Sequence, residues 1–170
     1  KLTQINIPSY VGVIGNEAFY LCRSLTKITI PSSVSQIKKC AFKGCESLVE
    51  ISLPDGITQI PENCFARCFS LKKIDIPSSV GVIFDFAFSE CSSLESFTVP
   101  PNVSKISNYM LRHCISLKTV NIHSNVKIIG NYAFDGCISL IEVEIPYSVQ
   151  KVYEYAFQHC RDLRKLTLPM

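Results

Sequence analysis

The stretch LTKITIPSSVSQIKKCAFKGCES, residues 25–47, recurs in altered form as LKKIDIPSSVGVIFDFAFSECSS at residues 71–93. Leucine recurs every 23 residues without insertion or deletion, at residues 2, 25, 48, 71, 94, 117, 140 and 163. The chain therefore holds seven full units and a partial eighth. A fixed period of this length indicates a repeat architecture, in which each unit packs only on its neighbours.

Several positions of the 23-residue unit have a physical interpretation. Positions 4 and 6 are apolar and alternate as a β-strand does, as in Ile28 and Ile30. Proline at position 7, present in seven of eight units, lacks a backbone donor and ends the strand. Positions 17, 18 and 21, such as Ala41, Phe42 and Cys45, have the spacing of one or two inward-facing helical turns. Each unit is thus predicted to run from a strand into helical turns.

The repeated apolar faces predict a stacked fold, because a single unit cannot bury its apolar face alone. Stacked coils place like residues on like at about 5 Å, the spacing of hydrogen-bonded strands. Equivalent strands then form a parallel sheet along one side. We predict that residues 1–170 form a single α/β repeat solenoid. Because the chain begins with Lys1, we also expect it to be a piece of a longer protein.

Seven of the nine cysteines occupy position 21 of the unit, where a small, weakly polar side chain suits a buried bend. Stacked side chains point the same way and leave neighbouring Cβ atoms near 5 Å, beyond the roughly 3.5–4.5 Å of a disulfide. We therefore predict reduced, buried, structural thiols. The column consists of Cys22, Cys45, Cys68, Cys91, Cys114, Cys137 and Cys160.

The two remaining cysteines lie outside that column. Cys64 occupies position 17, where most other units have alanine, and is expected in the core. Cys40, at position 16, is expected to be more exposed and is the best candidate for a reactive thiol. Zinc binding by Cys40 and Cys45, or by Cys64 and Cys68, is the alternative, but no pattern supplies the four converging ligands. We expect no metal and no cofactor.

Composition and motifs argue against several classes of function. A net charge of +3 does not predict a nucleic-acid partner, and no apolar run is long enough to insert into a membrane. The chain contains no nucleophile elbow, P-loop or zinc-protease motif. His113 and His159 precede Cys114 and Cys160, but they occupy variable position 20, so we predict solvent-facing side chains rather than a catalytic dyad. We expect no enzymatic activity.

The unit resembles the BspA-like leucine-rich repeat family, most closely in ITIPSSV (28–34), AFKGCESL (41–48) and AFDGCISL (133–140). The resemblance covers Leu2 to Pro169. One unit has Met110 and Leu111 in place of alanine and phenylalanine, and this exchange predicts only local repacking.

The resemblance implies a right-handed leucine-rich-repeat superhelix, with a parallel β-sheet on its concave face and short strands or helical turns on its convex face. It also implies a surface or secreted protein of host-associated bacteria or parasitic protozoa. Its implied role is adhesion and protein binding, with a host cell-surface or matrix protein as partner. A cytoplasmic location stays open.

The outward strand positions 3 and 5 line the presumed concave face and vary while the core positions do not. A rigid sheet with variable side chains suits protein recognition. The alternative is a merely solvated face, because the face is polar and lacks aromatic anchors. The candidate binding residues are Lys27, Thr29, Glu50, Ser52, Lys73, Asp75, Ser96, Thr98, Thr119, Asn121, Glu142 and Glu144.

A second candidate surface is aromatic. Position 16 is aromatic in four consecutive units, and position 14 adds two aromatics nearby. Such a row can mark an interface. The interpretation that we favour is a partly buried ladder covering the helical turns. The residues are Phe84, Phe86, Tyr109, Tyr132, Tyr153 and Tyr155.

Both ends of the array expose apolar residues, Leu2 at one end and Leu163, Leu166 and Leu168 at the other. Because solenoids need polar caps, we expect further chain or contacts with other chains there, including end-to-end self-association. The leading hypothesis is a non-enzymatic protein-binding or adhesion module that uses the sheet face. The alternatives are a passive spacer that displays another domain and a thiol-based redox protein.

Overall fold

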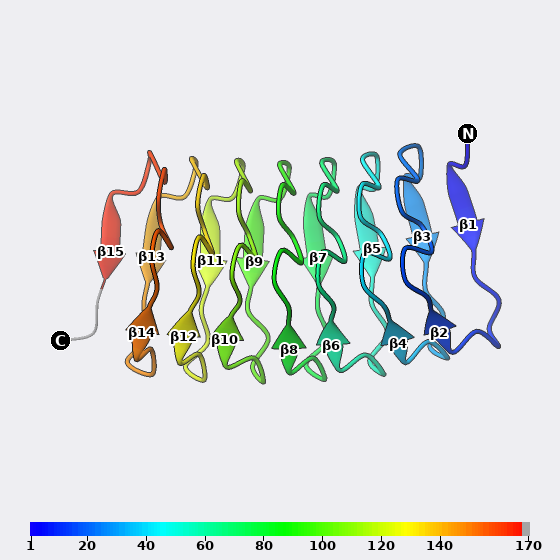
Figure 1. The fold of residues 1–170 in the computed structure, drawn as a ribbon, viewed down its shortest axis with the longest axis horizontal. Coiled ribbons are helices and arrows are strands. Elements are labelled where there is room, and N and C mark those ends of the chain that lie inside the picture. The colour runs from blue at the N-terminus through cyan, green and yellow to red at the C-terminus, as the bar shows by residue number, and fades with distance from the viewer. Residues whose placement is uncertain (168–170) are drawn as a thin grey trace.

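The chain folds into a row of coils stacked side by side, with its first and last strands at opposite ends of the row (Figure 1). The structure, a computed structural model, describes residues 1–167. Each complete coil contributes one three-residue strand and one two-residue strand. The three-residue strands are β1 (Gln4–Asn6), β3 (Lys27–Thr29), β5 (Glu50–Ser52), β7 (Lys73–Asp75), β9 (Ser96–Thr98), β11 (Thr119–Asn121), β13 (Glu142–Glu144) and β15 (Lys165–Thr167). The two-residue strands are β2 (Val13–Ile14), β4 (Gln36–Ile37), β6 (Gln59–Ile60), β8 (Val82–Ile83), β10 (Lys105–Ile106), β12 (Ile128–Ile129) and β14 (Lys151–Val152).

The register of the strands confirms the 23-residue stacking. Ile28 pairs in parallel with Ile51, and every other strand pair joins residues 23 apart. The three-residue strands form ladders β1-β3-β5-β7, β9-β11 and β13-β15, and the two-residue strands form β2-β4, β6-β8 and β10-β12-β14. Strands such as β7 and β9, which belong to different ladders, still lie side by side (Figure 1). Equivalent residues of successive coils are therefore neighbours throughout.

The expectation of helical turns, and with it the α/β description, is wrong. The described residues contain strands and turns but no helix. Positions 16 and 20 adopt positive φ in all seven coils, with φ of 58° at Cys40 and 75° at Gly44. A left-handed residue every four positions interrupts a right-handed helix. Backbone groups instead bond between coils, as in Phe42 N–H to Cys64 O at 3.0 Å. The fold is a parallel-strand β-solenoid.

Stacked phenylalanines fill the interior. Phe42 lies between Phe19 and Phe65, with ring centroids 5.3 and 5.4 Å away. The stack continues to Phe88, also at 5.4 Å, and resumes between Phe134 and Phe157 at 5.1 Å.

Leu111 interrupts this phenylalanine stack. Phe97, from β9 of the same coil, packs its edge against Phe88 at 5.2 Å and 60°. Leu111, Met110 and Phe97 are all buried. The expected local repacking therefore occurs, and the extra aromatic ring at position 4 compensates for the one missing at position 18.

All nine cysteines are free thiols, as predicted, and the five central members of the position-21 column are buried. The outer members, Cys22 and Cys160, are only half-buried, so the prediction of burial is wrong for these two. Within the position-21 column, each thiol from Cys45 onward donates a hydrogen bond to a backbone carbonyl of the preceding coil, for example Cys68 Sγ to Phe42 O at 3.3 Å. Burial raises the pKa of Cys45 and Cys91 to about 12. These side chains are therefore thiols rather than reactive thiolates near neutral pH.

The two cysteines outside the column are both buried. Cys64 is fully buried, as predicted. The prediction that Cys40 is exposed is wrong, because its exposed fraction is only 6% and burial raises its pKa. Equivalent residues stack, so its short side chain lies between the longer side chains of Glu17 and Asn63.

Candidate functional surfaces and a buried carboxylate

The outward face of the three-residue strands carries all twelve candidate binding residues. In β3, Lys27 and Thr29 are exposed on either side of buried Ile28, and this alternation recurs from coil to coil. Lys27 Nζ lies 3.4 Å from Glu50 Oε1 in the next coil. The parallel register thus brings these side chains into one polar, solvent-facing array, as expected for either a binding face or a solvated one.

The charges on this face are not evenly spread. Lys73 pairs with Asp75 of its own strand at 3.0 Å. Further along the stack, Glu142 and Glu144 lie opposite Lys165 and Thr167 of β15, and these four residues line a hollow of about 210 Å³. A larger hollow, of about 360 Å³, lies at the opposite end of the face beside Lys27 and Thr29, so both ends of the array are hollowed.

The aromatic residues at position 16 form a continuous ladder. Phe86 stacks on Tyr109 at 4.5 Å, Tyr109 on Tyr132 at 5.0 Å, and Tyr132 on Tyr155 at 4.9 Å. The first three are half-buried and Tyr155 is exposed. Since the rings face one another, their faces are already occupied and only their edges meet solvent. This geometry supports the interpretation as a partly buried ladder over the interpretation as an interface for a partner.

The position-14 aromatics do not extend that row. Phe84 and Tyr153 are exposed, but Ser107 and Gly130 occupy the equivalent position in the coils between them. Phe84 instead lines a separate groove of about 490 Å³ beside Phe86 and Lys105.

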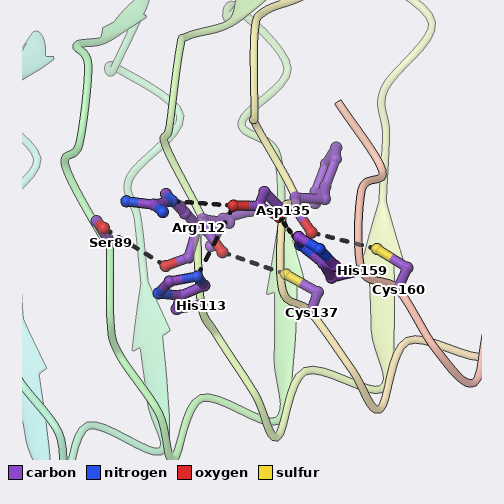
Figure 2. Close-up of polar contacts among 9 residues, drawn as sticks. Ser89, Arg112, His113, Asp135, Cys137, His159 and Cys160 are labelled. Carbon is purple, nitrogen blue, oxygen red and sulfur yellow. Dashed lines mark hydrogen bonds and ion pairs between the residues drawn. The ribbon is translucent and has the colours of Figure 1, made fainter. Parts of the chain in front are cut away.

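A buried carboxylate is the centre of a polar cluster (Figure 2). The Asp135 side chain is 3% exposed and receives a hydrogen bond from Arg112 Nε at 3.0 Å. His159 Nδ1 lies 2.8 Å from its other oxygen, Oδ1. His113 Nε2 lies 3.7 Å from Oδ2. The cluster thus joins three successive coils through one side chain.

Two opposing effects set the ionisation of this carboxylate. Burial alone raises the pKa of Asp135, but hydrogen bonds from Arg112 and His159 and the charge of Arg112 lower it below its ordinary value overall. Asp135 is therefore ionised near neutral pH, and its charge is balanced by Arg112.

Sequence reasoning missed this cluster. Asp135 occupies position 19, which varies between Tyr20, Lys43, Ala66, Ser89, Arg112 and Gln158 in the other coils. Asp135 lies 23 residues after Arg112 and 24 residues before His159, and this spacing of about one repeat could have predicted that the three side chains are neighbours. The histidines are partly exposed, as predicted, but they face this carboxylate, while the adjacent thiols bond to backbone carbonyls.

Within residues 1–167, no three histidine, cysteine or acidic side chains are arranged to hold a metal ion. The same residues include no helix that could cross a bilayer.

The stacked coils, the solvent-facing parallel strands and the buried leucine and phenylalanine columns define a leucine-rich-repeat solenoid. The sequence model of the BspA type leucine rich repeat region matches the chain in six copies, over residues 1–118 and 105–170. The chain belongs to this family.

Solved structures agree with this assignment. A leucine-rich repeat protein from Bacteroides ovatus superposes with a TM-score of 0.95 at 30% identity, over 99% of this chain and 46% of that one. The leucine-rich repeat protein of T. pallidum gives a TM-score of 0.88 at 34% identity, over 95% of this chain and 78% of that one. The pneumococcal vaccine antigen PcpA shares the fold at 21% identity and a TM-score of 0.68, over 98% of this chain and 51% of that one.

This chain therefore spans about half the length of the Bacteroides ovatus protein. No curated protein is significantly similar to it.

Proposed function

We propose that this chain is a non-enzymatic protein-binding module of a cell-surface or secreted leucine-rich repeat protein, and that it binds a partner through the outward face of β3 to β13. The single observation that supports this most is the array of exposed, varied side chains on a hydrogen-bonded parallel sheet. Backbone pairing fixes the strands, so little backbone conformational entropy is lost on binding. Membership of the BspA-type family supports the surface location and the adhesive role.

The partner that we propose is a host cell-surface or matrix protein. Charge complementarity favours a partner with basic groups opposite Glu142 and Glu144 and acidic groups opposite Lys27 and Lys73. Because the face carries no aromatic anchor, we expect moderate affinity from many weak contacts rather than a few dominant ones.

The test is affinity capture of host-cell surface proteins on the immobilised chain, followed by a binding titration with the captured protein. The variant Lys73→Ala/Glu142→Ala alters the sheet face. The matched control, Lys105→Ala/Glu154→Ala, removes one base and one acid from exposed sites outside that face. We expect the first variant to weaken binding about tenfold and the control to change it less than twofold. Equal binding by both variants would refute the proposal.

The second candidate function is a passive spacer that holds another domain away from a surface. It is favoured by the polar face without aromatic side chains. If the chain is a spacer, it should capture no specific host-cell protein, and neither variant should change the behaviour of an attached domain. A thiol-based redox role has less support, because the pKa values of the column thiols are raised by burial.

A further inference from the structure

A groove of about 510 Å³ runs along the edge of the stack where positions 20 and 22 of successive coils meet. Its apolar lining comes from Phe69, Ile115 and Ile138. The two isoleucines are 42% and 36% exposed. Position 22 is charged or polar in the other coils, as in Glu46 and Ser92. Ile115 and Ile138, in successive coils, therefore present a short apolar strip to solvent, and Ser92 separates this strip from Phe69.

Basic side chains flank this strip. His113, His159 and Arg161 line the same groove. Gly136 separates the two histidines, and a Cβ there would lie 2.3 Å from Cδ2 of His113. The glycine therefore makes room for the His113 ring, which leans over it toward the carboxylate that His159 contacts from the far side (Figure 2).

The acidic groups that face the histidines already have arginine partners. Asp135, which both histidines approach, is held by Arg112. Glu90, which lines the groove beside His113, pairs with Arg67 at 3.7 Å.

An incoming ligand therefore meets two imidazoles and Arg161. Histidine is the side chain whose charge ordinarily changes between pH 5 and 8.

We propose that this groove binds an acidic peptide segment of a partner protein, more tightly at pH 5.5 than at pH 7.5. Leucine-like side chains of the segment cover Ile115 and Ile138, and its carboxylates pair with His113, His159 and Arg161. The apolar strip favours a peptide over a sulfated polysaccharide, which could use only the basic rim. The groove lies apart from the outward face of β3 to β13, so this site does not depend on the function proposed above.

The experiment is a fluorescence anisotropy titration of the full chain with a labelled twelve-residue peptide of alternating leucine and glutamate. Glutamate stays ionised over this pH range, so a pH effect reports on the protein. We expect affinity to rise about tenfold from pH 7.5 to pH 5.5, the effect of two weak ion pairs. A peptide of alternating leucine and lysine should not bind at either pH.

Three variants locate the site. His113→Gln/His159→Gln keeps hydrogen-bonding side chains and should reduce the pH effect to less than twofold. Ile115→Ser/Ile138→Ser should weaken binding at both pH values, and Arg161→Ala, at an exposed site, should do so without affecting folding. The sheet-face variant Lys73→Ala/Glu142→Ala should bind the peptide normally, which separates this site from the proposed sheet-face function.

Five results would overturn the proposal. The first four are no peptide binding up to about 1 mM (a free energy of about −4 kcal/mol), equal binding of the basic peptide, an affinity that does not change between pH 7.5 and pH 5.5, and unchanged binding by the groove variants. Displacement of the peptide by heparin at equal or lower concentration would also overturn it, since the groove would then recognise a polyanion without using its apolar strip.

Discussion

The solenoid contains two aromatic stacks with similar spacing and different surroundings. The inner stack, Phe19 to Phe88, has ring centroids 5.3–5.4 Å apart, and its members from Phe42 onward are fully buried. The outer ladder, Phe86 to Tyr155, has centroids 4.5–5.0 Å apart and contacts solvent. The 23-residue period imposes stacking on both. Only the inner stack excludes water, so stability should depend on it far more strongly.

The largest expected effect follows from deleting one inner ring. Phe65→Ala removes a fully buried side chain between two stacked neighbours and leaves a cavity that rigid coils fill poorly. We expect a loss of roughly 3–5 kcal/mol in the free energy of unfolding, measured by urea denaturation.

The matched control is Tyr132→Ala, which removes a ring of the outer ladder that also has two stacked neighbours. Because this ring is half-buried, the loss should be only about 1 kcal/mol. Equal losses at the two positions would contradict the distinction between the stacks.

The interruption of the inner stack offers a second test. Leu111→Phe restores the repeat pattern, but Phe97 already packs against Phe88, the ring on which a phenylalanine at 111 would stack, so overpacking should cost roughly 1–3 kcal/mol. Adding Phe97→Ile, the residue type found at position 4 of other coils, should recover most of that loss.

A double-mutant cycle in urea measures the coupling between Phe97 and Leu111. Additive effects in this cycle would mean that Phe97 does not compensate for Leu111.

Much of this fold can be predicted from the sequence, because columns of identical residues can stack in few ways. The strand positions around Ile28, the buried cysteine column and the aromatic ladder all follow from the period. The helical turns could not be excluded, because Ala41, Phe42 and Cys45 have helical spacing. The left-handed residues, such as Cys40, are mostly not glycine, so the sequence gives no sign of the left-handed conformation. The Asp135 cluster was missed because position 19 varies from coil to coil, so no repeated residue type marks it.

Replacement of the buried carboxylate of Asp135 should have a smaller effect. Asp135→Asn keeps the shape but loses a charged acceptor for Arg112 and His159, at a cost of roughly 1–2 kcal/mol near pH 7. The pKa of Asp135 is lowered in the folded state, so its stabilisation is present above about pH 4, the unfolded value, and is lost as pH falls through the folded value. Urea denaturation from pH 7 to pH 3 should show the wild-type advantage shrinking. A constant difference would rule out this electrostatic contribution.

The smallest effect is expected on the sheet face. Lys27→Gln breaks an ion pair with Glu50 whose two side chains are mostly exposed, and such pairs contribute about 0.5 kcal/mol or less. Thermal unfolding at low and high salt should barely separate the variant from the wild type. A loss near that of Tyr132→Ala would mean that this face stabilises the solenoid rather than serving a partner.

The accessibility of the cysteine column tests the continuous interior most directly. The folded chain is exposed to iodoacetamide at pH 7.5, and each cysteine is followed by mass spectrometry with and without denaturant. Stacked coils predict that partly exposed Cys22 reacts first, that Cys160 follows slowly, and that Cys45, Cys68, Cys91, Cys114 and Cys137 react only on unfolding. Rapid labelling of those five in the folded chain, or a disulfide between any of them, would contradict a single interior shared by successive coils.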